Sequence, residues 1–154
     1  METRKKIGRY TRVYHQLQDL LYNAPDFDAK LATIVAVLHH KIDYFFWTGF
    51  YVIKDGELIV KTYQGPVACQ VLEKNKGVCW AGINQKKIII VPDVHEFPGH
   101  IACDSRSNSE IVVPVRNKKG DVIGVFDVDS KDLNSFDDVD KEWLEKITEL
   151  IVKK

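Results

Sequence analysis

The chain has 154 residues, of which 45% are hydrophobic and 29% charged, and its 22 basic residues balance its 22 acidic ones. This length fits one domain with a core large enough to fold without disulfides, and a formal net charge of zero argues against a general role on nucleic acid or an anionic membrane. The longest apolar runs, such as 88–91, fall far short of the roughly 20 residues of a membrane-spanning helix. The N-terminus also lacks a signal-peptide core, so we expect a cytoplasmic protein.

Two helices are predicted in the N-terminal segment, about residues 5–42. In the first helix, apolar side chains recur at steps of three and four, at Ile7, Tyr10, Tyr14, Leu17 and Leu21. Pro25 separates this helix from a second one, which begins near the capping residue Asp26. The apolar face expected for the second helix consists of Leu31, Ile34, Val35, Leu38 and Ile42. The heptad-like spacing of the first helix also suggests a homodimer contact.

A sheet and several loops are predicted for about residues 44–130. Aromatic and β-branched residues indicate a strand over 45–53, and alternation indicates another over 57–64. The Asp55-Gly56 pair between them is a hairpin signal. The elements expected next are a short helix over 78–85 and strands over 87–91, 110–116 and 122–128. The loop 92–108 has no periodicity, and loops of this length in compact domains are commonly functional.

The last helix is expected at about 136–152, because Ser135 with Asp138 three residues later has the spacing of a capping box. Its expected apolar stripe is Val139, Trp143, Ile147 and Leu150. Hairpins in this order predict a mainly antiparallel sheet with the N- and C-terminal helices packed on it. We therefore expect a single α+β domain over 1–154. The glycine-rich phosphate-binding motifs are missing from the sequence.

Three cysteines, Cys69, Cys79 and Cys103, are the first candidates for chemistry. A free cysteine often only fills space in a core. However, Cys69 and Cys103 fall in irregular segments that are expected to be accessible. Cys79 falls at the start of the short helix, where the helix field favours a thiolate, although it can equally be a small core residue. His95 and His100 raise the question of a zinc site, but close cysteine pairs are missing, so we expect no metal.

Acidic and aromatic residues form a second group of candidates. Asp127 and Asp129 are two apart on a predicted strand and therefore share a face, and Glu110 begins the preceding strand. Such carboxylates can bind an ammonium group or raise one another's pKa to give a proton donor; a solvated sheet edge is the alternative. Trp47 and Tyr51 also share a strand face, either as core residues or as an apolar wall for a ligand.

Six sequence blocks carry a resemblance to a known family. They are WTGFY at 47–51, QGPVAC at 64–69, GVC at 77–79, VPDVHEFPGHIACDS at 91–105, SEIVVP at 109–114 and GVFDVDS at 124–130. These blocks resemble those of the free methionine-(R)-sulfoxide reductases, and the likeness runs from about residue 44 to 137. The resemblance implies a GAF fold and reduction of the free amino acid sulfoxide.

The resemblance also implies roles for individual residues. Cys103 matches the catalytic cysteine, and Cys69 and Cys79 match resolving positions. The substrate-binding positions that it implies are Glu110, Asp127, Asp129, Trp47 and Tyr51. The implied chemistry is a sulfenic acid on Cys103 followed by an intramolecular disulfide. No bound cofactor is expected, and the reducing equivalents would come from NADPH through thioredoxin.

Two other functions stay open at this point. A non-catalytic GAF module would bind a small ligand, such as a cyclic nucleotide, and would have no use for a pair of thiols. A redox sensor would keep the cysteines but would not need the ammonium site.

Overall fold

The computed structural model describes residues 1–100 and 103–153. Residues 101 and 102, which belong to the motif at 91–105, and Lys154 lie outside the described residues. Eleven elements follow one another in the described part of the chain: α1 (Thr3–Leu21), α2 (Phe27–Lys41), β1 (Trp47–Lys54), β2 (Glu57–Gln64), β3 (Val71–Leu72), α3 (Gly77–Gln85), β4 (Ile89–Val91), a 3₁₀ turn (Val94–Glu96), β5 (Ser109–Arg116), β6 (Val122–Ser130) and α4 (Asp138–Glu149).

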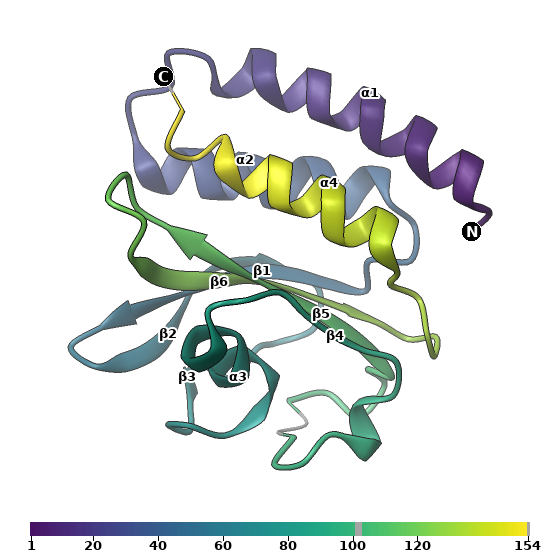
Figure 1. The fold of residues 1–154 in the computed structure, drawn as a ribbon, viewed down its shortest axis with the longest axis vertical. Coiled ribbons are helices and arrows are strands. Elements are labelled where there is room, and N and C mark those ends of the chain that lie inside the picture. The colour runs from purple at the N-terminus through teal and green to yellow at the C-terminus, as the bar shows by residue number, and fades with distance from the viewer. Residues whose placement is uncertain (101–102, 154) are drawn as a thin grey trace.

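The six strands form one sheet in the order β3-β2-β1-β6-β5-β4, and every neighbouring pair is antiparallel. Helices α2 and α4 lie on one face of this sheet, and α1 packs across both of them as an outer layer (Figure 1). Helix α3 lies on the other face. The α+β architecture predicted from the sequence is therefore confirmed, with the refinement that α1 packs mainly on helices.

The first two helices begin and end close to the predicted positions. Asp26 caps α2 by accepting a hydrogen bond from the backbone N–H of Ala29 at 2.8 Å, as expected. In α1, however, Ile7 was wrongly placed in the buried stripe. Its side chain is 44% exposed, whereas Lys6 is buried because its ammonium group pairs with Asp140. The homodimer contact on this helix stays a prediction.

The start of the last helix was also wrongly predicted. The capping residue is Asp137, which accepts from the backbone N–H of Val139, while the Asp140 side chain accepts from the backbone N–H of Asp137. Ser135 instead lies 2.7 Å from the hydroxyl of Ser130. Of the expected apolar stripe, Ile147 and Leu150 are buried, together with Leu144, whereas Val139 and Trp143 are half-buried and pack against the core.

Alternation along the central strands gives the sheet two different faces. The helical face carries a core that includes Phe50, Phe126 and Val128. The opposite face carries a smaller core with α3. Helix α3 comes close to the sheet at Gly82, where an added Cβ would lie 2.8 Å from a methyl carbon of Val112. The short strand β3, which the sequence analysis missed, forms the sheet edge beside β2.

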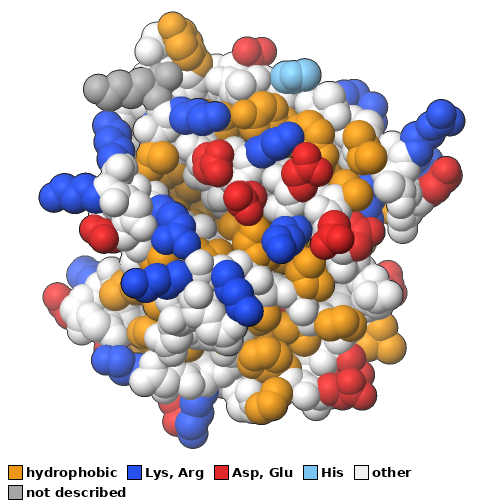
Figure 2. Space-filling model, viewed as in Figure 1, with side chains coloured by type: hydrophobic (Ala, Val, Ile, Leu, Met, Phe, Trp, Pro, Cys, Tyr) orange, Lys and Arg blue, Asp and Glu red, His pale blue; other side chains and the backbone are white. Residues whose placement is uncertain are grey.

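None of the helices in the described part of the chain combines the length and the apolarity needed to cross a membrane. The surface facing the viewer in Figure 2 carries acidic and basic side chains interspersed with apolar ones. This distribution agrees with the balanced net charge of the sequence.

Candidate active site

The three candidate carboxylates come together on the sheet face that α3 covers. Asp127 and Asp129 lie on β6, and Asp129 pairs directly with Glu110 on β5. Because β6 continues to Ser130, Asp129 lies within the strand and points to the same side as Asp127. The sequence predicted the shared face of the two aspartates, but the cross-strand register is what adds Glu110 to them.

Burial makes these carboxyl groups reluctant to ionise. Glu110 and Asp127 are each 5% exposed. Burial, and then the charges of the two neighbouring aspartates, raise the pKa of Glu110 well above its ordinary value. Burial likewise raises the pKa of Asp127 and of Asp129. The site therefore holds protons on at least part of this cluster in conditions where exposed carboxyl groups would be ionised.

Trp47 and Tyr51 form one wall of the pocket. Their rings stack with centroids 5.7 Å apart. Gly49 between them is required, because an added Cβ would lie 2.5 Å from the Trp47 ring. The polar groups of both side chains hold the segment that leads to Cys69. The Trp47 indole N–H donates to the carbonyl of Pro66, and the Tyr51 hydroxyl donates to the carbonyl of Cys69, both at 3.1 Å.

Cys69 and Cys103 form a disulfide, with Cα atoms 5.5 Å apart. Cys103 is exposed and Cys69 is half-buried, so both lie in accessible positions, as the sequence predicted. Cys79 is a free thiol in the third position of α3 and is only 5% exposed. Burial, and then the neighbouring carboxylates, raise the pKa of this thiol. The alternative that the helix field makes Cys79 a thiolate is therefore wrong: desolvation outweighs the helix field.

The segment after Cys103 is tied to the carboxylates and to β6. The Ser107 hydroxyl donates to Asp129 at 3.3 Å, and the Asn108 backbone N–H donates to the carbonyl of Ser130 at 2.8 Å. Asp104 accepts two side-chain hydrogen bonds from Arg106, which lower the pKa of Asp104 to about 2. These contacts fix the Cys103 segment over the carboxylates.

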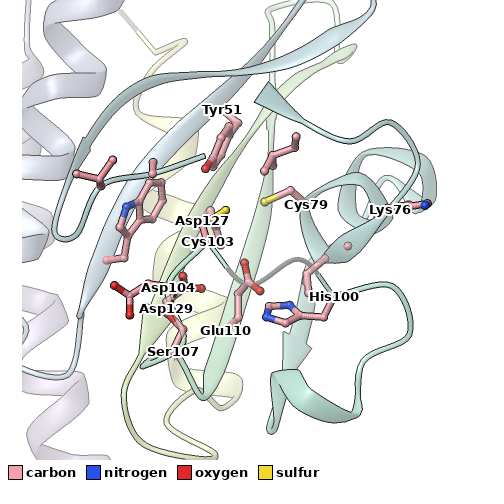
Figure 3. Close-up of a pocket in the computed structure, with 16 residues that line it drawn as sticks. Tyr51, Lys76, Cys79, His100, Cys103, Asp104, Ser107, Glu110, Asp127 and Asp129 are labelled. Carbon is pink, nitrogen blue, oxygen red and sulfur yellow. Dashed lines mark hydrogen bonds between the residues drawn. The ribbon is translucent and has the colours of Figure 1, made fainter. Parts of the chain in front are cut away.

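These groups line one pocket of about 600 Å³, including its open mouth. Its lining consists of Trp47, Tyr51, Val67, Ala68, Leu72, Lys76, Gly77, Val78, Cys79, His100, Cys103, Asp104, Ser107, Glu110, Asp127 and Asp129. Seven of the eight residues selected from the sequence therefore line the same cavity, and the eighth, Cys69, is joined to it through its disulfide with Cys103. Figure 3 shows the labelled side chains around this cavity.

Sequence reasoning missed Ser107 and Lys76 as lining residues, and assigned His100 only to the loop. These three residues lie in the irregular segments around the cysteines, which was the one sequence feature that could have indicated them. Only the folded loops bring their side chains to the pocket. His95 braces the loop through Asn108, with its Nε2 3.1 Å from the side-chain oxygen. Among the described residues, the one set placed to hold a metal is Cys79, Glu110 and Asp127.

The chain is similar in sequence and in structure to known proteins. The family model described as GAF domain matches residues 24–152. A free methionine-R-sulfoxide reductase of Escherichia coli is 35% identical, over 94% of this chain and 87% of the relative. The protein of the same name from Saccharomyces cerevisiae is 50% identical, over 70% of this chain and 61% of the relative. The structure of free methionine-R-sulfoxide reductase from Neisseria meningitidis in complex with its substrate superposes with a TM-score of 0.90 at 36% identity, covering 95% of this chain and 87% of that one.

Proposed function

The chain belongs to the free methionine-R-sulfoxide reductases of the GAF domain family, and we propose that it reduces free L-methionine-(R)-sulfoxide with Cys103 as the nucleophile. The observation that carries this proposal is a Cys69–Cys103 disulfide at a pocket floored by Glu110, Asp127 and Asp129. A module that only binds a small ligand needs no such thiol pair. A redox sensor needs no buried carboxylates.

Substrate binding follows from the chemistry of the pocket walls. The ammonium group of a free amino acid matches the carboxylates of Glu110, Asp127 and Asp129, which lack a cationic partner among the described residues. The apolar side chain of the substrate fits against Trp47 and Tyr51. A methionine sulfoxide within a peptide has no free ammonium group, so the same carboxylates select the free amino acid.

The first chemical step is oxygen transfer to Cys103. A protonated carboxyl group of the cluster donates to the sulfoxide oxygen, which makes the substrate sulfur electrophilic. The Cys103 thiolate attacks, the S–O bond of the sulfoxide breaks, and the oxygen with its proton ends on Cys103 as a sulfenic acid. Methionine leaves with its sulfur reduced, and one cysteine sulfur has been oxidised.

The second step forms the disulfide. The Cys69 thiol attacks the sulfur of the Cys103 sulfenic acid, a new S–S bond forms and water leaves. An external dithiol, for which we propose thioredoxin supplied with electrons from NADPH, then reduces the disulfide by exchange. The Cys79 thiol is buried and its pKa is raised. We therefore propose that Cys69, and not Cys79, attacks the sulfenic acid. This scheme uses no bound cofactor.

A single-turnover experiment tests the roles of the cysteines. Reduced Cys69→Ser and Cys79→Ser should each release about one equivalent of methionine per chain without added reductant, because oxygen transfer needs only Cys103 and the acid. Cys103→Ser should release none. Thioredoxin-driven cycling should slow most in Cys69→Ser, and a dimedone-type reagent should then label Cys103. A label on Cys79, or full activity in Cys103→Ser, would contradict the assignment.

Substrate selectivity gives a second test, on the unmodified protein. We expect turnover of the free (R)-sulfoxide and little turnover of the (S) epimer or of N-acetylated methionine sulfoxide, because acetylation removes the ammonium charge. NADPH consumption in the presence of thioredoxin and its reductase measures all three. Equal rates on free and acetylated substrate would reject the ammonium assignment.

A further inference from the structure

The pocket contains one potential ligand group more than the binding of an amino acid substrate requires. Besides its carboxylates it presents the buried Cys79 thiol, which the proposed reaction does not need. We propose that Cys79, Glu110 and Asp127 form a binding site for one thiophilic divalent cation, such as Zn²⁺, and that the bound cation competes with the substrate.

The geometry of the three side chains supports this site. The Cys79 sulfur and one carboxylate oxygen each from Glu110 and Asp127 all lie within 4.8 Å of one another. A point about 2.8 Å or less from all three therefore exists, and zinc bonds are roughly 2.0 Å to oxygen and 2.3 Å to sulfur. The side chains come from α3, β5 and β6 and line the same pocket (Figure 3). A contraction by a fraction of an ångström on each side would bring all three donor atoms to bonding distance.

A second observation points independently to a ligand at this place. The Oδ1 atom of Asp127 is buried and has no hydrogen-bond partner among the described residues. A buried polar atom without a partner costs on the order of 1–3 kcal/mol, and buried polar groups in folded proteins are nearly always paired. The fold therefore keeps an acceptor ready for a positively charged partner from outside the chain.

The identity of the donors selects the class of cation. Ca²⁺ and Mg²⁺ prefer oxygen ligands throughout, whereas a thiolate with two carboxylates suits a borderline-soft ion such as Zn²⁺. All three side chains line the pocket, and zinc sites with three protein ligands keep one position for water. Neither Glu110 nor Asp127 forms an ion pair within the described part of the chain, so no protein cation needs to be displaced.

The competition with substrate rests on the proposed function, but the metal site does not. The Asp127 oxygen cannot satisfy a cation and a substrate ammonium group at once. Zn²⁺ would therefore inhibit the reductase competitively, without touching Cys69 or Cys103.

Cobalt binding to the oxidised protein tests the site. With Cys69 and Cys103 joined, Cys79 is the one thiol left to the chain. Titration with Co²⁺ should produce a thiolate-to-cobalt charge-transfer band that saturates at about one equivalent per chain and disappears when Zn²⁺ is added. The band should be lost in Cys79→Ser, and the affinity should fall roughly tenfold or more in Asp127→Asn and in Glu110→Gln.

Asp104→Asn is the matched control, because it removes an acidic group of the same pocket and leaves the three proposed ligands in place. It should bind cobalt like the parent protein, and near-ultraviolet circular dichroism should show that every variant is folded. No band in the oxidised parent, a band that persists in Cys79→Ser, or equal weakening in Asp104→Asn would overturn the site.

The last arm adds free methionine-(R)-sulfoxide to the cobalt-loaded protein. Displacement of cobalt supports competition for Asp127. Saturating cobalt binding that the substrate leaves unchanged would overturn the competition and would point to a different substrate position, while the metal site itself would stand.

Discussion

Asp140 and Asp127 are both buried carboxylates, and the sheet separates their surroundings. Asp140 is completely buried at the start of α4. It accepts a hydrogen bond from the Lys6 ammonium group at 2.6 Å and another from the Tyr10 hydroxyl at 2.7 Å. The Tyr44 hydroxyl and the backbone N–H of Asp137 also donate to it. Every strong acceptor position of Asp140 therefore has a partner from the same chain.

The carboxylates on the opposite face are buried without such compensation. Asp127 and Glu110 lack a cationic partner within the described residues, and one oxygen of Asp127 has no hydrogen bond. Burial raises the pKa of both groups. A carboxylate that stabilises the fold is thus buried together with partners from the same chain, whereas one that serves binding or proton transfer is buried without them and stays available to an external ligand.

The largest effect on stability is expected from Lys6→Met. Removing the ammonium group leaves Asp140 buried without its charge partner, which typically costs about 3–5 kcal/mol. Urea unfolding measures the loss, and reductase activity below the transition should be close to that of the parent protein. Lys5→Met, at the exposed neighbouring position, is the control. A loss below about 1 kcal/mol would mean that the Lys6–Asp140 pair contributes little to the fold.

Glu110→Gln should show the opposite pattern. A charge-assisted contact to substrate is worth about 1.5–3 kcal/mol, or roughly ten- to a hundredfold in kcat/KM. Stability should be unchanged or higher, because a buried acid without a counter-charge has been removed. Glu57→Gln, an exposed position on β2, should leave both quantities unchanged. Near-normal kcat/KM in Glu110→Gln would remove this residue from the site.

The stability difference between Glu110→Gln and the parent should grow with pH. Because the pKa of Glu110 is raised in the folded state, the folded state binds more protons than the unfolded state above the ordinary value of 4.5. The unfolding free energy of the parent therefore falls as pH rises, by at most about 1.4 kcal/mol per pH unit for one group. Urea unfolding of both proteins at several pH values from 4 to 8 measures the difference in their unfolding free energies. A constant difference would show that the pKa of Glu110 is the same in both states.

The smallest effect is expected from Tyr10→Phe, which removes one of several donors to Asp140. One hydrogen bond to a charged group is worth about 1.5–3 kcal/mol when lost outright, and the remaining donors should reduce the cost to roughly 1 kcal/mol. Thermal unfolding of Tyr14→Phe, on the same helix with its ring against Trp143, gives the comparison. Equal losses in both variants would mean that the hydrogen bond from Tyr10 to Asp140 contributes no measurable stability of its own.

Much of the site was predictable because its signals are local. Alternation along a strand places Asp127 beside Asp129 and Trp47 beside Tyr51, since successive side chains point to opposite faces. The hairpin at Asp55 and the cap at Asp26 depend on a few neighbouring residues, and both are as predicted. The failures were also instructive: Ser135 and Asp138 have the same local spacing as the true capping pair Asp137 and Asp140, so spacing alone could not separate them.

Local signals in the sequence therefore predicted most of the helices and strands, the shared strand faces and, through the resemblance, the family. The tertiary structure decided which distant residues meet: Cys69 with Cys103 across 34 positions, and Lys6 with Asp140 across 134. It also decided that Cys79 is a buried thiol among carboxylates. The physical reason is that periodicity and capping act over one or two turns of chain, whereas burial and the pKa shifts that follow from it depend on every element packed around a group.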